Sequence, residues 1–203
     1  MVFFMLSLKR NNLMLNFSKK NIARILSLLF IILCFITPST AKTIAIKKTN
    51  SYKEDSTYYL DTVFEFKLTD EANEALIHGI PLEVHTLFQL RVERKWLWDK
   101  TVSEKLVVIK LEHMPLTNTY LTININTGLR NSYSNLDTAL KEMNNISQMK
   151  LFDESILEKN KNYLARIKTF VDIASLPPPL RPQAYFSSDW EISSDWIEWE
   201  VIQ

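Results

Sequence analysis

The chain has 203 residues, with 24 Lys or Arg, 23 Asp or Glu and 46% hydrophobic residues. This composition excludes a wholly disordered chain, and the 2 glycines exclude a collagen-like or linker-like one. The length suits one domain or two small ones, and the lack of any run of 18 uncharged apolar residues excludes a multi-span membrane protein.

The first 41 residues differ from the rest of the chain. They contain five basic residues and no acidic one, and the apolar run Ile25–Ile36 leads to Ser39-x-Ala41. A basic flank, a short apolar core and small residues at its end are typical of a secretory signal peptide. We therefore expect a signal helix over residues 1–41, cleaved between Ala41 and Lys42. Met14 is an alternative start, and an uncleaved anchor in the inner membrane is the alternative fate.

Residues 42–203 contain 19 Lys or Arg, 23 Asp or Glu and no cysteine. The net charge of −4 argues against a nucleic-acid partner, because phosphates require a basic face. Without cysteine, disulfides, thiolate zinc sites and a cysteine nucleophile are excluded after cleavage. We expect one β-rich domain over 42–203, exported to the periplasm and held together by its core.

Alternation of apolar and polar residues dominates this domain and predicts strands. The second predicted strand is unusually long, so we expect it to bend or carry a bulge. The continuous apolar run Leu106–Ile109 favours a strand buried on both faces. The predicted strands are Tyr58–Leu68, Leu82–Trp96, Ser103–Glu112, Thr119–Asn126 and Tyr163–Ile173.

Two or three short helices are predicted between the strands. Asp70 is expected to cap a helix over Glu71–His78, and Ser134 begins a capping-box-like start to a second. Residues 153–159 add a third turn or helix, and the prolines of Leu176–Pro182 predict a stiff extended connector. Tight turns without βαβ alternation favour a mainly β fold, an antiparallel sheet or β-sandwich, for which an immunoglobulin-like arrangement is one form.

The histidines provide the only hint of a metal site. If residues 96–102 form a symmetric hairpin, His85 and His113 lie opposite each other, because each is 14 positions from Asp99. A catalytic zinc needs three protein ligands, so we interpret both as surface histidines and expect no metal or other cofactor. An envelope hydrolase using His85 or His113 with nearby carboxylates is the alternative.

Tryptophans near turns and at the C-terminus are candidate binding residues. Trp98 lies in or near a turn, and Trp196 and Trp199 are three positions apart, so a strand points them to opposite faces. Tryptophan rings stack on sugars or anchor partner proteins, although core packing is the competing interpretation and the one expected for Trp96.

Two arginines complete the candidate surface. Arg91 and Arg94 lie on opposite faces by parity, and Arg94 falls among apolar positions. A half-buried arginine normally has a carboxylate partner, so we expect one for Arg94, from Asp99, Glu104 or Asp172.

Scattered but ordered residues carry a family resemblance over residues 58–203. They are Tyr59-Leu60, Glu74-Ala75-Leu76, Gly79-Ile80-Pro81-Leu82, Arg91, Arg94, Trp96, Trp98-Asp99, Leu116-Thr117, Tyr120, Ala139-Leu140, Leu176-Pro177, Pro179-Leu180-Arg181, Asp189-Trp190, Ser194, Trp196 and Trp199. In these residues the chain resembles the domain of unknown function 4390 family, exported proteobacterial proteins sometimes labelled proline-rich signal peptide proteins. The resemblance implies an envelope protein with no established activity and transfers no catalytic residue. The resemblance also implies that the protein is an accessory to a membrane signalling system.

We therefore interpret the chain as a non-enzymatic periplasmic binding or interaction module. The expected partner is an envelope or inner-membrane protein, contacted through Arg91, Arg94, Trp98, Trp196 and Trp199. The alternatives are the hydrolase and a structural subunit that docks through its aromatic C-terminus.

Overall fold

The computed structural model describes residues 44–94 and 98–201. The predicted signal sequence, the predicted cleavage position at Ala41 and Lys42, and Trp96 lie outside the described residues. Within the described ranges, no helix has the length and apolar character needed to cross a membrane. The strands and α-helices are β1 (Ile44–Glu54), β2 (Thr57–Phe66), α2 (Asp70–Ile77), β3 (Leu82–Val92), β4 (Lys100–Met114), β5 (Thr119–Asn124), β6 (Arg130–Tyr133), α3 (Leu136–Met143), β7 (Asn145–Asp153), β8 (Tyr163–Val171), α4 (Arg181–Phe186) and β9 (Ile197–Glu200).

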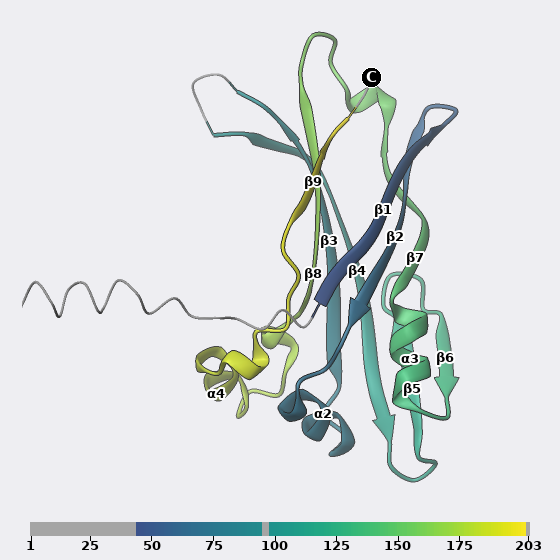
Figure 1. The fold of residues 1–203 in the computed structure, drawn as a ribbon, viewed down its shortest axis with the longest axis vertical. Coiled ribbons are helices and arrows are strands. Elements are labelled where there is room, and N and C mark those ends of the chain that lie inside the picture. The colour runs from purple at the N-terminus through teal and green to yellow at the C-terminus, as the bar shows by residue number, and fades with distance from the viewer. Residues whose placement is uncertain (1–43, 95–97, 202–203) are drawn as a thin grey trace, which may run out of the picture. The chain divides into compact units, whose positions relative to one another are not determined.

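The strands form two antiparallel sheets (Figure 1). The smaller sheet has the order β1-β2-β7, and the larger has the order β6-β5-β4-β3-β8-β9. Buried side chains of both sheets, such as Leu60 on β2 and Phe88 on β3, share one core cluster. The sheets therefore pack face to face, and the predicted mainly β, antiparallel sandwich with short helices is confirmed.

Strict alternation on the two central strands of the larger sheet builds the core. In β3 and β8 every second residue is buried, and the residues between them are half-buried on the outer face. The two strands pair in continuous register from Val84 opposite Val171 to Val92 opposite Tyr163. Each large apolar side chain buried in this way contributes about 1.5–3 kcal/mol, so this pair organises the sandwich.

The helices cover one end of the sandwich and close the first core cluster, which includes Leu76 of α2, Leu140 of α3 and Ala184 of α4. The observed N-caps each lie one residue from the predicted ones. Thr69, not Asp70, caps α2 by accepting a hydrogen bond from the Ala72 N–H. Asn135, not Ser134, caps α3 by accepting one from the Thr138 N–H. In both cases the capping side chain belongs to the last extended residue before the helix.

Two further strand predictions have clear outcomes. The long strand predicted over Leu82–Trp96 does contain a register shift, between Leu90 and Arg91. The prediction that Leu106–Ile109 is buried on both faces was wrong, because Leu106 is 40% exposed. The outer face of β4 is open at Leu106, although Val108, the next residue on that face, is buried.

Candidate functional site

An aromatic cleft opens where one edge of each sheet meets the other. We call it the seam cleft. It has a volume of about 230 Å³ and is bordered by β1, an edge strand of the smaller sheet, and β9, an edge strand of the larger sheet. Its lining residues are Ser51, Tyr52, Lys53, Tyr58, Leu151, Phe152, Ala165, Trp199, Glu200 and Val201.

Stacked rings form the inner wall of the seam cleft. Tyr58 and Phe152 stack with ring centroids 4.6 Å apart, and the Phe88 centroid lies 6.2 Å from those of both Phe152 and Trp199. Phe88 is fully buried and Phe152 is 2% exposed, whereas Trp199 is half-buried. The wall is therefore anchored in the second core cluster, and its shape is set before any ligand arrives.

Polar groups at the rim are held in place by their neighbours. The Lys53 Nζ lies 2.6 Å from Glu154 Oε1, and this hydrogen bond raises the pKa of Lys53 above its ordinary value. Partial removal from water raises the pKa of Tyr52, and the carboxylates of Asp61 and Glu54 raise it further. Lys53 pairs with the buried Tyr58 and so lies on the face of β1 that borders the cleft, where its ammonium group is charged at neutral pH. The Tyr52 ring stacks on Tyr59 on the opposite face of the strand.

Both strands that border the cleft have an unpaired edge. Among the described residues, β1 pairs only with β2 and β9 pairs only with β8. β1 is 11 residues long, while β9 has four residues. An unpaired strand edge presents backbone N–H and C=O groups that another extended chain can bind.

The predicted binding residues do not form one surface. Trp98 is 90% exposed and lies between β3 and β4 in the sequence. Arg91 lies nearby on the outer face of β3, and its guanidinium is 3.4 Å from the Asp99 carboxylate. The prediction that Arg94 has a carboxylate partner was wrong. Arg94 is exposed and forms no ion pair within the described part of the chain. β3 ends at Val92, so the alternation that placed Arg94 on the inner face no longer applies there.

Trp196 and Trp199 face opposite sides of the larger sheet. Trp199 packs against the second core cluster and lines the seam cleft. The guanidinium of Arg166 lies over the Trp196 ring, 4.1 Å from the ring centroid. Arg166 also donates two hydrogen bonds to Gln89 Oε1, at 2.6 and 2.9 Å. Of the five predicted binding residues, only Trp199 belongs to the cleft.

The structure does not bring His85 and His113 together. His85 has its side chain on the outer face of β3. His113 is buried, and its ring contacts the Ile77 carbonyl oxygen at 3.1 Å and Asn118 Oδ1 at 3.3 Å. The assumed hairpin symmetry about Asp99 was wrong, since the β3–β4 register places His85 opposite Val108 rather than opposite His113.

Sequence reasoning missed three aromatic residues of the cleft: Tyr52, Tyr58 and Phe152. Alternation predicts the strand that contains Tyr58, but its partner Phe152 is 94 positions away. An available signal was the density of aromatic and β-branched residues in Tyr52–Tyr59, where three tyrosines surround a turn.

The architecture is thus an antiparallel β-sandwich with an aromatic cleft at its seam. Residues 41–200 match the sequence family described as "Domain of unknown function (DUF4390)", and the chain belongs to that family. This confirms the resemblance found in the sequence and extends the matched region toward residue 41. No curated protein and no solved structure was found to match the chain.

Proposed function

We propose that this protein is a non-enzymatic binding module whose ligand is an extended polypeptide segment. In this proposal one large apolar side chain of the ligand enters the seam cleft, and the ligand backbone pairs with the free edge of β1. The observation that carries the proposal is the position of the cleft: its aromatic wall opens directly beside an unpaired strand edge. Pockets for side chains beside a strand edge are how proteins recognise peptides by strand addition.

The size of the cleft supports a side chain rather than a cofactor. Sites for drug-sized molecules typically have volumes of about 300–1,000 Å³, above the 230 Å³ found here. Tyr58, Phe152 and Trp199 supply flat apolar surface, which favours an aromatic or large aliphatic side chain. Ser51, Lys53 and Glu200 add polar groups at the opening.

The charges on β1 argue for selective pairing of its edge. Lys47 is bound to Glu65 at 2.8 Å, and Lys53 to Glu154 at 2.6 Å. Charged edge residues, lysines above all, discourage indiscriminate strand pairing between copies of a protein. A ligand is therefore expected to need a side chain that fits the cleft as well as a backbone that pairs.

We also propose that the module works in the periplasm. The support is the basic, acid-free segment 1–41 with its apolar run and small residues before Lys42. Residues 42–203 contain no cysteine, so the domain needs no disulfide in an oxidising compartment. The expected partner is an extended segment of an envelope or inner-membrane protein.

The binding proposal is tested with a phage-displayed library of random 12-residue peptides selected on the full chain. The probe is then the most enriched peptide, synthesised and titrated by fluorescence anisotropy. We expect enriched peptides to share an aromatic or large aliphatic residue. Ser51→Arg is expected to weaken binding by more than about tenfold, because the exposed Ser51 lines the cleft and an arginine there fills its opening.

The matched control is Ser132→Arg. Ser132 is also exposed and also lies on an edge strand, β6, but outside the seam cleft. The proposal predicts unchanged affinity for this variant. Failure to enrich any peptide, or equal affinity of the two arginine variants, contradicts it.

A further inference from the structure

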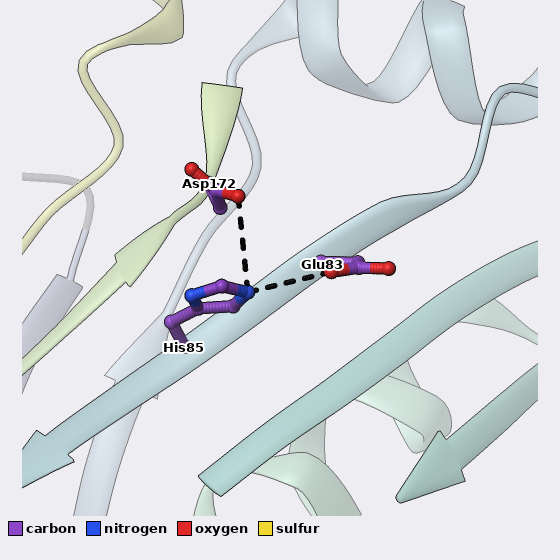
Figure 2. Close-up of side chains that lie close together, drawn as sticks. All are labelled: Glu83, His85 and Asp172. Carbon is purple, nitrogen blue, oxygen red and sulfur yellow. Dashed lines mark hydrogen bonds and ion pairs between the residues drawn. The ribbon is translucent and has the colours of Figure 1, made fainter. Parts of the chain in front are cut away.

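We infer that Glu83, His85 and Asp172 form a binding site for a divalent transition-metal ion, with Zn²⁺ the ion that suits it best. The three side chains converge on the outer face of the larger sheet (Figure 2). One ligand atom from each lies within 4.8 Å of the other two. None of these three residues lines the seam cleft, so the metal-site inference does not depend on the proposed peptide binding.

Strand geometry places the three groups together. Glu83 and His85 are two positions apart on β3, which puts both side chains on one face. Asp172 directly follows β8, and its N–H donates a 2.9 Å hydrogen bond to the Glu83 carbonyl. That backbone bond fixes the distance between the two segments that supply the ligands.

The distances approximate those between ligands of a tetrahedral zinc ion. His85 Nε2 lies 3.4 Å from Glu83 Oε2 and 4.0 Å from Asp172 Oδ2. Zinc–ligand bonds of about 2.0–2.2 Å place tetrahedral ligands about 3.3–3.6 Å apart, so shifts of about 1 Å complete the set. The 3.4 Å contact between His85 Nε2 and Glu83 Oε2 is long for a hydrogen bond, so this nitrogen is only weakly hydrogen-bonded to Glu83.

The surroundings hold these side chains in place. The Ala174 N–H donates to Asp172 Oδ1 at 3.1 Å, which leaves Oδ2 directed toward His85. The Phe170 ring packs beside the imidazole with centroids 5.5 Å apart. Outer contacts of this kind orient metal ligands and raise metal affinity.

Two carboxylates this close to one imidazole call for a cation. Lys110 lies directly opposite Glu83 on β4, but it is bound to Glu112 at 2.6 Å. The ligand set of one imidazole and two carboxylates suits zinc better than magnesium or calcium, which prefer oxygen alone. Three protein ligands leave a fourth position for water or for a group of a partner.

The test is titration of the full chain, prepared without a histidine tag, with ZnCl₂ in a calorimeter. We expect one site that His85→Gln, Glu83→Gln and Asp172→Asn each weaken by more than about tenfold. His78→Gln is the matched control, because His78 is exposed at the end of α2, outside the cluster, and contacts the Glu74 carbonyl oxygen. That variant is expected to bind zinc as the wild type does.

Imidazole resonances of the wild-type chain provide a readout that does not depend on the folding of variants. Zn²⁺ is expected to shift the His85 ring signals and to leave those of His113 in place. Absence of binding at 1 mM Zn²⁺, equal loss in the His85 and His78 variants, or unchanged affinity in both carboxylate variants overturns the inference.

Discussion

Tyr58 and Phe152 are direct cross-strand partners in the β2–β7 pair, and their rings stack with centroids 4.6 Å apart. The stack joins the smaller sheet to the second core cluster and forms the inner wall of the seam cleft. Stability and the proposed binding site therefore share side chains here. For this reason the blocking variant of the binding test adds volume at the exposed Ser51 and leaves the stack intact.

Phe152→Ala is expected to destabilise the protein by about 3–5 kcal/mol, the usual cost of removing a buried phenylalanine. Phe152 is 2% exposed and contacts Phe88 as well as Tyr58. Phe186→Ala is the control, because Phe186 is 94% exposed, and we expect a change within about 0.5 kcal/mol. Urea unfolding followed by circular dichroism measures both. Similar costs for the two variants contradict the burial described for Phe152.

Gly79→Ala is expected to cost about 1–2 kcal/mol through backbone strain alone. Gly79 has φ +83° after the C-cap His78, and no neighbouring atom lies within 4 Å of the place that an added β-carbon would occupy. Its N–H donates to the Leu76 carbonyl, and the Ile80 N–H donates to the Ala75 carbonyl, which is a Schellman motif. Gly79→Asn is expected to cost less than the alanine variant in the same unfolding assay. The reverse order contradicts this explanation.

Thr69→Ala is expected to cost about 1 kcal/mol or more in unfolding free energy, because Thr69 makes two hydrogen bonds. Its hydroxyl accepts from the Ala72 N–H and donates to the Asp189 carbonyl at 2.8 Å. Asp70→Asn, one residue later, removes only a charge near the helix N-terminus and is expected to cost less. A larger cost at Asp70 contradicts the assignment of Thr69 as the cap.

The pKa of Asp153 is expected to lie below its ordinary value. Hydrogen bonds from Lys150 and then from Thr57 stabilise the carboxylate. A lowered carboxyl pKa stabilises the folded state above the unfolded pKa, and this contribution is lost as the pH falls through the folded pKa. Thr57→Val should move the Asp153 pKa back toward its ordinary value, which a carbon-detected NMR titration measures. An unchanged pKa in this variant shows that the Thr57 hydroxyl does not stabilise the carboxylate.

Sequence patterns predicted those strands that bury one face in the core. Alternation identified β2, β3 and β8, where buried and less buried residues follow each other regularly. It could not identify β1, because an edge strand pairs through its backbone and only Ile44 of this strand is buried. It also missed β7, where two register shifts against β2 interrupt the alternation and Gln148 adopts a positive φ.

The candidate sites depend on contacts that are distant in the sequence. The seam cleft combines β1, β2 and β7 with β8 and β9, and strand order cannot be read from periodicity. Glu83 and His85 were visible as a two-residue spacing on one strand face. Their third partner, Asp172, becomes a neighbour only because β3 pairs with β8, a connection between strands that are not consecutive.

The central proposal, that an extended peptide pairs with β1 and fills the seam cleft, is tested most directly by hydrogen exchange at individual amides. The selected 12-residue peptide is added to the full chain, and exchange is compared with and without it. We predict slower exchange along the 11 residues of β1 and a shifted indole signal of Trp199. Protection confined to the outer face of the larger sheet or to the surroundings of Trp98, with β1 unchanged, contradicts the proposal.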